Sequence, residues 1–389
     1  MLIVGLMSGT SLDGVDAALV EIDGPADRPV WRMHAYVDMP YSPEQRHALH
    51  EGMTSGDAAA LCRLHADLGE WFAEAVLRVC RAAAVDTADV TAVGSHGQTI
   101  WHEPPAAGRR GATLQLGCAA TIAERTGIDV ISDFRTRDVA AGGEGAPLVP
   151  WVDRLLFAHD VHARVLQNIG GMANLTLVPP RGRAAPLLAF DTGPGNALID
   201  AAVELASAGD STFDRDGAWA EAGHVDAALL AELLAQPYFA RTPPKSTGRE
   251  TFGRPLVDAL ARRVQPEGWS GWADLIATLT ELTARSICDA ITRWAVPQGV
   301  DEVIITGGGA HNRFLVERMR TLLSPIAVHA DAAALGVQPG AKEALAFAAL
   351  AWAHVMGLPG NVPEATGAAG PRVLGSFTPG RTAATARTT

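Results

Sequence analysis

Residues 5–16 read GLMSGTSLDGVD and lie between two apolar runs, LIV at residues 2–4 and AALVEI at residues 17–22. Both runs have the composition of β-strands, so the quoted residues connect two strands. From residue 8 onward the connection holds two glycines, three hydroxyl side chains and two acids. Two interpretations fit this composition: an ordinary corner of a β-hairpin, or a cradle for phosphate groups.

Three more glycine-rich turns follow predicted strands: NIGGMAN at 168–174, DTGPGN at 191–196 and TGGGAHN at 306–312. Glycine allows a backbone to approach a ligand closely, and a glycine turn before a helix directs free N–H groups toward an anion. Four such turns in one chain favour nucleotide or phosphate binding over four unrelated structural turns.

Neither of the two common nucleotide motifs is present. The two lysines, Lys245 and Lys342, lie outside any G-x-x-x-x-G-K-[ST] motif, and no G-x-G-x-x-G opens a helix near the N-terminus. The remaining possibility is a hairpin that binds phosphate through backbone amides and hydroxyls, with carboxylates placing Mg²⁺.

The order of predicted elements divides the chain into two α/β halves. In the first third strands alternate with helices, and apolar residues three or four apart predict a helix over residues 57–85. Residues 165–178 read strand, glycine turn, strand, which repeats the N-terminal hairpin. A chain of 389 residues also exceeds one ordinary domain. We expect an N-terminal α/β domain over 1–160, completed by a helix near 358–375, a C-terminal α/β domain over 161–357 with a helical insert, and a disordered tail over 376–389.

Composition excludes several classes of protein. Hydrophobic residues make up 48% and charged residues 19% of the chain, as in a soluble globular protein. A net charge of −12 argues against nucleic acid or an anionic membrane as the main partner. The longest apolar run, residues 344–358, is too short to span a bilayer, and we expect no signal peptide before the first strand. The four cysteines form no C-x-x-C pair, so we expect a cytoplasmic protein without disulfides or a zinc site.

Eight blocks of the sequence resemble, in their order, the anhydro-N-acetylmuramic acid kinase family: MSGTSLDGVDAAL, GSHGQTIWHEP, SDFRTRDVAAGGEGAPLVP, NIGGMANLT, FDTGPGNALID, PKSTGRE, ITGGGAHN and GVQPGAKEALAFAALA. The resemblance extends from about residue 2 to residue 377. This family belongs to the superfamily of sugar kinases, actin and heat-shock chaperone ATPases. The resemblance implies two related α/β domains of the actin-like, ribonuclease H-like type, with an active-site cleft between them.

The activity that the resemblance implies depends on ATP and Mg²⁺. Enzymes of this family hydrolyse the 1,6-anhydro bridge of 1,6-anhydro-N-acetylmuramic acid and phosphorylate O6, giving N-acetylmuramic acid 6-phosphate and ADP in peptidoglycan recycling. A homodimer is also expected from the resemblance. Two alternatives remain: another sugar or polyol kinase of the same superfamily, or an ATP-gated binding module like the chaperone ATPases. The binding module requires a large further domain, which the sequence does not indicate.

The resemblance places the ATP phosphates on the turn that opens the chain, at Gly9, Thr10, Ser11, Leu12, Asp13, Gly14, Val15 and Asp16. Asp13 and Asp16 would repel phosphate directly, so Mg²⁺ or its water ligands must lie between them. The alternatives are a turn-forming Asp13 and a strand-edge Asp16. TGGGAHN is also typical of a simple strand-to-helix turn. Further nucleotide contacts are expected at Gly171, Asn174, Gly307, Gly308, Gly309 and Asn312.

Asp191 is the predicted catalytic base. It follows the predicted strand at 187–190 and precedes two glycines that open a helix, which places its carboxylate at a strand end. A 1,6-anhydro sugar has no free O6, because O6 bridges back to C1. A carboxylate that deprotonates water lets the water attack C1 and release O6 for phosphoryl transfer. The alternative is an N-cap aspartate for the following helix.

Five further residues are expected to bind the sugar: His96, Gln98, Arg135, Gly193 and Glu343. Arg135 can bind the lactyl carboxylate of the substrate through two nitrogens. Ordinary alternatives are His96 as a hydrogen-bonded loop residue, Arg135 paired with Asp133 or Asp138, and Glu343 as a complement to a helix dipole. Lys245, in PKSTGRE, has no assigned role. Cys118 stands where the family pattern has a polar residue, often Asp.

Overall fold

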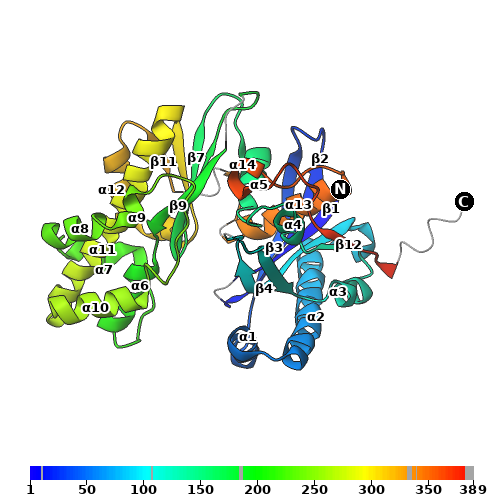
Figure 1. Cartoon of the computed structure of the whole chain (residues 1–389), viewed down its shortest axis with the longest axis horizontal. Coiled ribbons are helices and arrows are strands. Elements are labelled where there is room, and N and C mark those ends of the chain that lie inside the picture. Colours follow the sequence, from blue (N-terminus) through cyan, green and yellow to red (C-terminus); the bar gives the residue numbers. More distant parts are fainter. Residues whose placement is uncertain (10–11, 107, 184–186, 331–334, 339, 382–389) are drawn as a thin grey trace, which may run out of the picture. The chain divides into compact units, whose positions relative to one another are not determined.

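The structure is a computed structural model, and it describes residues 1–9, 12–106, 108–183, 187–330, 335–338 and 340–381. The chain divides into two compact units. The first unit contains Met1–Phe157 and the chain from Gly340 onward, and the second contains Ala158–Pro339 (Figure 1). No helix within the described ranges is long and apolar enough to cross a membrane.

The first unit is built on one mixed sheet. Its strands are β1 (Leu2–Ser8), β2 (Gly14–Asp23), β3 (Val30–Pro40), β4 (Ala92–Glu103), β5 (Ala112–Leu116), β6 (Val130–Ser132) and β12 (Ser376–Thr378). They lie in the order β12-β6-β4-β1-β2-β3, with β5 paired to β4. The helices are α1 (Pro43–Ser55), α2 (Ala58–Ala83), α3 (Ala119–Thr126), α4 (Thr136–Ala140), α5 (Val149–Phe157), α13 (Lys342–Val355) and α14 (Pro363–Thr366).

The second unit contains a smaller sheet and a larger set of helices. Its strands are β7 (Arg164–Ile169), β8 (Met172–Val178), β9 (Leu188–Pro194), β10 (Glu302–Thr306) and β11 (Ala327–His329), in the order β11-β10-β7-β8-β9. Its helices are α6 (Ala197–Ala206), α7 (Ala218–Ala222), α8 (Ala227–Leu234), α9 (Pro237–Ala240), α10 (Arg254–Val264), α11 (Gly268–Ala290) and α12 (Arg313–Leu323). Strand β9 forms one edge of this sheet.

The two sheets repeat one topology. In the first, β1, β2 and β3 form an antiparallel meander, and β4 and β6 are added in parallel beside β1. In the second, β7, β8 and β9 form the meander, and β10 and β11 are added in parallel beside β7. This is the strand order of the ribonuclease H-like fold, which actin-like ATPases contain twice. The prediction of two related α/β halves of this type is confirmed.

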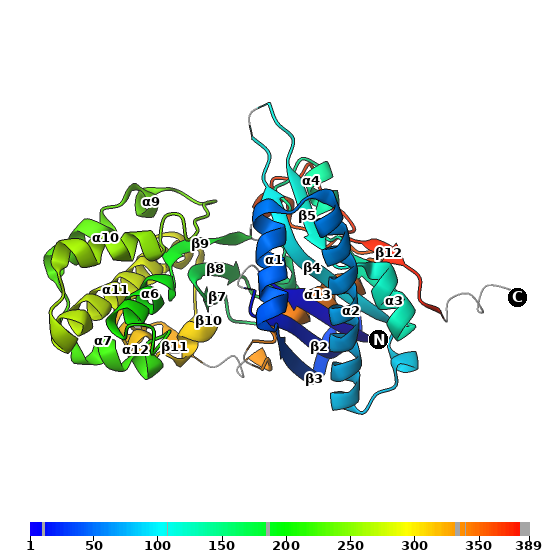
Figure 2. The ribbon, with the colours of Figure 1, turned by 90° about the horizontal axis from the view of Figure 1, so that it is seen from below.

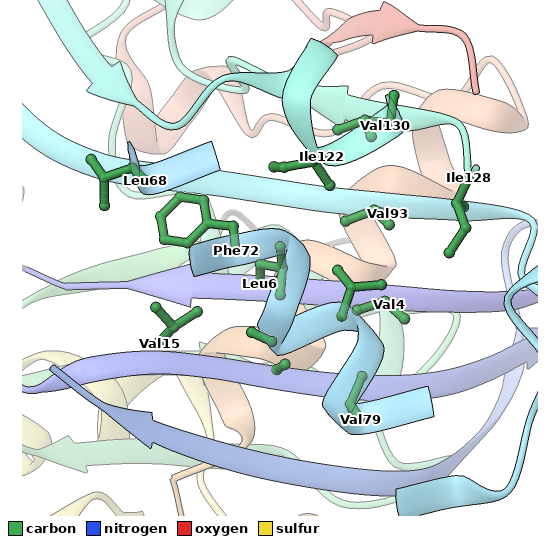
Figure 3. Packing of buried hydrophobic residues seen from close by; sticks show 14 of the residues in the cluster. Val4, Leu6, Val15, Leu68, Phe72, Val79, Val93, Ile122, Ile128 and Val130 are labelled. Atoms are coloured by element: carbon green, nitrogen blue, oxygen red, sulfur yellow. The ribbon is translucent and has the colours of Figure 1, made fainter. Parts of the chain in front are cut away.

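Helix α2 covers one face of the first sheet. Its apolar side chains recur at helical spacing, as the sequence predicts, and Leu68, Phe72 and Val79 are fully buried against the sheet. Figure 2 shows α2 lying along the sheet of the first unit, and in Figure 3 Val4 and Leu6 of β1 point toward the side chains of this helix. The helix begins where the Asp57 side chain accepts a hydrogen bond from the Ala60 N–H, and it ends at Ala84, which has a left-handed conformation.

Helix α13 packs on the opposite face, where glycine makes room for it. Gly5 of β1 is paired with Gly94 of β4. A Cβ atom at Gly5 would lie 1.9 Å from the carbonyl oxygen of Ala344, and one at Gly94 would lie 2.2 Å from that of Phe347. The backbone of α13 therefore lies directly on the sheet. The boundary predicted at residue 357 differs from this division, because α13 belongs by its contacts to the first unit.

The chain after α13 is more extended than the sequence predicts. A helix was expected near 358–375, but only the short α14 forms there. Part of the predicted disordered tail, Ser376–Thr378, is strand β12, which pairs with β6 because that strand leaves an edge of the sheet unpaired. Further along, the Gly380 N–H donates to Asp129 over 2.7 Å. Residues 382–389 of the predicted tail lie outside the described residues.

Cys118 occupies the N-cap position of α3, and its side chain makes no capping hydrogen bond. An aspartate at this position would accept a hydrogen bond from a free N–H of the first helical turn, which explains why a polar residue is expected there. We therefore expect Cys118→Asp to stabilise the protein by about 1 kcal/mol. Denaturant unfolding of both proteins measures the difference, and Cys118→Ala, which cannot cap, should show no gain. An unchanged midpoint for Cys118→Asp would contradict the capping account.

Candidate active site

The turn between β1 and β2 is supported from within the first unit. The Leu12 N–H donates to the Gly9 carbonyl over 3.2 Å, and Leu12 has a φ of 56°. Gln98 Nε2 donates to the same Gly9 carbonyl over 3.2 Å, while Gln98 Oε1 accepts from the Ser8 hydroxyl over 2.5 Å. Gln98, which was predicted to bind sugar, therefore supports the hairpin turn. Its sugar contact stays a prediction.

Two of the residues predicted to hold phosphate can do so only through their backbone. Val15 is fully buried in the core of the first unit, and Leu12 packs against that core. Gly14 lies close to β3, since a Cβ atom there would be 2.5 Å from the Met39 carbonyl oxygen. Thr10 and Ser11, also predicted here, lie outside the described residues.

The two acids of this turn have partners of their own. Asp13 is exposed, and its Oδ1 accepts a hydrogen bond from the Gly14 N–H over 3.0 Å, as a turn-forming aspartate does. Asp16 accepts a hydrogen bond from the Tyr36 hydroxyl. Burial raises the pKa of Asp16 to about 6, and the negative charges of Asp38, Asp13 and Glu343 add to this rise. Across the described ranges, no group of three or more His, Cys, Asp or Glu is arranged to hold a metal ion.

His96 and Arg135 contact each other. Arg135 Nε donates to His96 Nε2 over 3.1 Å, and Arg135 Nη1 donates to the Gly145 carbonyl over 2.8 Å. The alternative partners are occupied elsewhere: Asp133 accepts from Thr136, and Asp138 accepts from the Gly145 N–H and two other donors. Burial and the charge of Arg135 lower the pKa of His96 to about 3, so its imidazole is neutral.

Glu343 lies in the first turn of α13, and its side chain is exposed. The surrounding protein desolvates the Glu343 carboxyl and so raises its pKa, whereas the positive charges of Lys342 and Arg135 lower it. Burial lowers the pKa of Arg135 to about 10, and Glu343 opposes this change. The structure thus brings three of the predicted sugar-binding residues, His96, Arg135 and Glu343, into one electrostatically coupled group.

In the second unit, two of the glycine turns pack against each other. The N–H groups of Gly195 and Asn196 donate to the carbonyls of Gly171 and Gly170 over 2.9 and 2.8 Å. The DTGPGN turn therefore rests on the NIGGMAN hairpin, directly before α6. Gly193 has a φ of 146°, and a Cβ atom there would lie 2.8 Å from Phe239 Cε1, so glycine is required at this position.

The TGGGAHN turn lies against the end of β7. Cβ atoms at Gly307 and Gly309 would lie 2.7 Å from Asn168 Oδ1 and 2.4 Å from Ile169 Cγ2, so the packing of the chain itself requires both glycines. Gly308 is more open, because the closest atom to a Cβ there would be Asn196 Nδ2 at 3.6 Å. Asn312 is the N-cap of α12, and its side chain accepts from the Leu315 N–H over 2.9 Å. These structural roles explain most of the motif without a ligand, and the nucleotide contacts stay predictions.

Asp191 lies on the edge strand β9, opposite Asn174 of β8. The pairing shifts by one residue beside it, which leaves Thr192 as an extra residue and turns the strand locally. Helix α6 begins at Ala197 with Asn196 at its N-cap, so Asp191 is not the N-cap of this helix. The half-buried Asp191 carboxylate accepts one hydrogen bond, from the Thr247 N–H over 3.0 Å. Burial raises the pKa of Asp191, and the bond from Thr247 opposes the rise.

Sequence reasoning missed several residues around this site. Tyr238 donates to the Asp191 carbonyl over 2.6 Å, and Thr247 binds its carboxylate. Arg249 lies beside the second-unit hairpin: a Cβ atom at Gly171 would be 3.5 Å from Arg249 Nη2. Arg249 is exposed, and we find no hydrogen bond from it to any described residue. The available signal was the block PKSTGRE, which contains both Thr247 and Arg249.

Nearly the whole described chain matches the model of one protein family. That family is anhydro-N-acetylmuramic acid kinase, and the match covers residues 1–380. A protein of this description from Gloeobacter violaceus is 46% identical, over 97% of this chain and 98% of its own length. Another from Ralstonia nicotianae is 47% identical, over 97% of each chain.

Two solved structures show weak likenesses to this chain. An activator of 2-hydroxyisocaproyl-CoA dehydratase from Clostridium difficile is 13% identical with a TM-score of 0.43, covering 92% of this chain and 96% of its own. A ROK family glucokinase from Streptomyces griseus is 15% identical with a TM-score of 0.37, covering 90% of this chain and 99% of its own. The assignment depends instead on the family match and on the curated relatives, which share nearly half of their residues with this protein along its length. On that evidence, the chain belongs to the anhydro-N-acetylmuramic acid kinase family.

Proposed function

We propose that this protein is an ATP-dependent kinase that opens the 1,6-anhydro bridge of 1,6-anhydro-N-acetylmuramic acid and phosphorylates O6. Its products are N-acetylmuramic acid 6-phosphate and ADP, and its place is in peptidoglycan recycling. The observation that carries the proposal is the match of residues 1–380 to the anhydro-N-acetylmuramic acid kinase family. Asp191, a half-buried carboxylate that forms no ion pair with any described residue, is the proposed base. Burial raises the pKa of Asp191, and a carboxylate with a raised pKa is a stronger base than an ordinary exposed one.

The proposed reaction couples two bond changes. Asp191 accepts a proton from a water molecule, and the water oxygen bonds to C1 of the sugar. The C1–O6 bond breaks, and its electron pair stays on O6. O6 then attacks the γ-phosphorus of ATP, the bond from that phosphorus to the bridging β–γ oxygen breaks, and ADP leaves.

The nucleotide is proposed to bind backbone N–H groups of the glycine turns, at residues 9–16 and 306–312 and at the Gly170–Gly171 hairpin. Arg249 beside Gly171 adds a positive charge for the phosphates. Asp13 and Asp16 fit a role in holding Mg²⁺, because burial and then the charges of Asp38 and Asp13 raise the pKa of Asp16, and a bound cation would stabilise its charged form. When bound, Mg²⁺ would neutralise the charge that develops on the departing ADP.

The sugar is proposed to bind His96, Arg135 and Glu343. Arg135 uses Nε and Nη1 within the protein, and Nη2 is left to bind the lactyl carboxylate. Neutral His96 fixes the guanidinium plane, and Glu343 can accept hydrogen bonds from sugar hydroxyls. We further propose that the protein acts in the cytoplasm, where its ATP is available, as a homodimer.

Hydrolysis in ¹⁸O-labelled water tests the proposal. The protein is incubated with ATP, Mg²⁺ and the anhydro sugar, and the product is examined by mass spectrometry. We expect one ¹⁸O atom per sugar phosphate, on the C1 hydroxyl, and one ADP for each sugar phosphate. Unlabelled product incubated in the same water corrects for exchange at C1. Release of ADP without a sugar phosphate, or label on the phosphate group, would overturn the proposed reaction.

A further inference from the structure

Lys245 is a buried cation whose role the proposed reaction does not explain. It is one of two lysines in the chain, and only 6% of it is exposed. Its Nζ donates to the carbonyls of Tyr238 and Phe239 over 3.2 and 3.4 Å and lies 4.7 Å from the centre of the Tyr238 ring. No carboxylate of the described chain forms an ion pair with it. Burying a charged group without an opposite charge costs free energy of folding, and a neutral side chain would avoid this cost. The contacts that the ammonium group makes therefore indicate its role.

The backbone of the same segment binds Asp191. Because β9 is an edge strand, its outer backbone groups have no strand to pair with. The Asp191 N–H instead donates to the Lys245 carbonyl over 3.0 Å, and the Asp191 carbonyl accepts from the Tyr238 hydroxyl over 2.6 Å. Two residues further on, the Thr247 N–H binds the Asp191 carboxylate. Three hydrogen bonds between Asp191 and residues 238–247 therefore hold both the backbone and the carboxylate of Asp191 in place.

The Lys245 side chain joins the two ends of this segment. Helix α9 has only four residues, and the carbonyls that Lys245 binds are at its end. Phe239, one of these two residues, also packs against Gly193 of β9. Tyr238 of α9 and Thr247 also meet through their bonds to Asp191, and the Lys245 contact adds a direct link between the end of α9 and the segment that carries Thr247.

We propose that Lys245 is a positioning residue for Asp191: its ammonium group binds the end of α9 and so holds the Thr247 N–H on the catalytic carboxylate. This proposal rests on the proposed function, in which Asp191 is the base. The hydrogen bond from Thr247 favours the charged carboxylate and opposes the effect of burial. If Lys245 is replaced by a neutral residue, the bond is loosened, the pKa of Asp191 rises further, and the base is protonated at a higher pH.

Few other charged groups face this site. Tyr238 of α9 contacts Asp191 through its hydroxyl, and burial raises its pKa, so it stays protonated. Lys245 also borders a cavity of about 250 Å³, on whose wall lie Asp289 of α11 and Arg293. Burial lowers the pKa of Lys245, and the positive charges of Arg241 and Arg293 lower it further. None of these groups forms a hydrogen bond with the Asp191 carboxylate.

The test compares Lys245→Met, which keeps the length of the side chain, with Lys245→Arg, which keeps its charge. The cavity beside Lys245 leaves room for the larger guanidinium. For Lys245→Met we expect kcat to fall about tenfold or more at neutral pH, because the base is displaced, while KM for ATP changes less than about twofold. The acidic limb of the pH–rate profile should move to higher pH. Lys245→Arg should restore most of kcat and return the limb to its original position.

Arg263→Gln is the control, since Arg263 is an exposed cation of the same unit that pairs with Glu232. Folded fractions are measured by circular dichroism, and rates are expressed per folded molecule. If Lys245→Met folds poorly, Lys245→Gln replaces it. A loss of kcat without movement of the acidic limb would show a merely structural role and overturn the proposal, as would a normal kcat. If Asp191→Asn were fully active, the proposed function itself would fail, whereas an inactive Asp191→Asn with a normal Lys245→Met would reject only the positioning role.

Discussion

Asp191→Asn is expected to lower turnover of the anhydro sugar by about 10²–10⁴-fold, the usual contribution of a general base. The amide cannot take the proton from water, so C1 is not attacked and O6 is never released for phosphoryl transfer. The fold should survive, because the Tyr238 and Lys245 bonds go to the backbone of residue 191, and the amide oxygen can still accept from the Thr247 N–H. The variant should therefore bind ATP with nearly normal affinity.

Coupled measurement of ADP and sugar phosphate tests this expectation, with calorimetric titration of ATP binding alongside. Asp289→Asn is a matched control, because Asp289 is an exposed acid of the same unit, on α11, and forms no hydrogen bond with the Asp191 carboxylate. The pH dependence gives a second test. The base must be deprotonated, so wild-type activity should be present above the raised pKa of Asp191 and be lost as the pH falls through it. A normal rate for Asp191→Asn would remove this residue from the reaction.

Local patterns predicted the elements of the fold well. The helical period of α2 and the strand–turn–strand pattern of both hairpins depend on residues close in sequence, and both are confirmed. The strand–turn–strand pattern at 165–178, which repeats that of the first hairpin, correctly indicated a repeated topology. The hairpin belongs to the antiparallel meander, whose strands are joined by short turns and are therefore visible in the local sequence.

Local sequence patterns could not predict how segments distant in sequence pack together. Helix α13 follows the TGGGAHN turn in sequence, and the predicted boundary at residue 357 placed it in the second half. Its position depends on Gly5 and Gly94 being neighbours across two strands, and this register is known only once β1 and β4 are paired. Strand β12 is a similar case, since a short polar segment becomes a strand only because β6 offers an unpaired edge.

The candidate site likewise contains residues that local sequence can indicate and residues that only the folded chain brings together. Asp191 follows an apolar strand and could be singled out, whereas its supports come from residues 238–247, which are distant in sequence and have no regular pattern. Sequence reasoning also counted some residues as ligand contacts that the structure shows in structural roles. Asn312 caps α12, and Gly307 and Gly309 fit against β7, so a glycine turn alone does not separate packing from ligand binding.

Arg249→Gln is expected to lower kcat by about 10²–10³-fold, because it removes a charge from the place where the phosphate is proposed to bind. The chain lacks a P-loop lysine, and Arg249 is a cation that lies beside the second-unit hairpin. Its guanidinium is not held by a hydrogen bond within the described chain, so it is available to a phosphate. Its charge also acts on Asp200, where it opposes the burial that raises the pKa of that acid to about 7.

The expected loss is specific to phosphoryl transfer, so it should appear in kcat while KM for the anhydro sugar stays nearly unchanged. Arg249→Lys should recover only part of the rate, because an ammonium group cannot donate two parallel hydrogen bonds to a phosphate. Arg254→Gln is the matched control: Arg254 is close in sequence, but it is already paired with Glu204 and Asp258. The test is to measure kcat and KM of the three variants by steady-state kinetics and to compare them with the wild type. If Arg249→Gln turned over as fast as Arg254→Gln, the hairpin would need no cation from Arg249, and the phosphates would have to be stabilised by the backbone N–H groups and the bound metal alone.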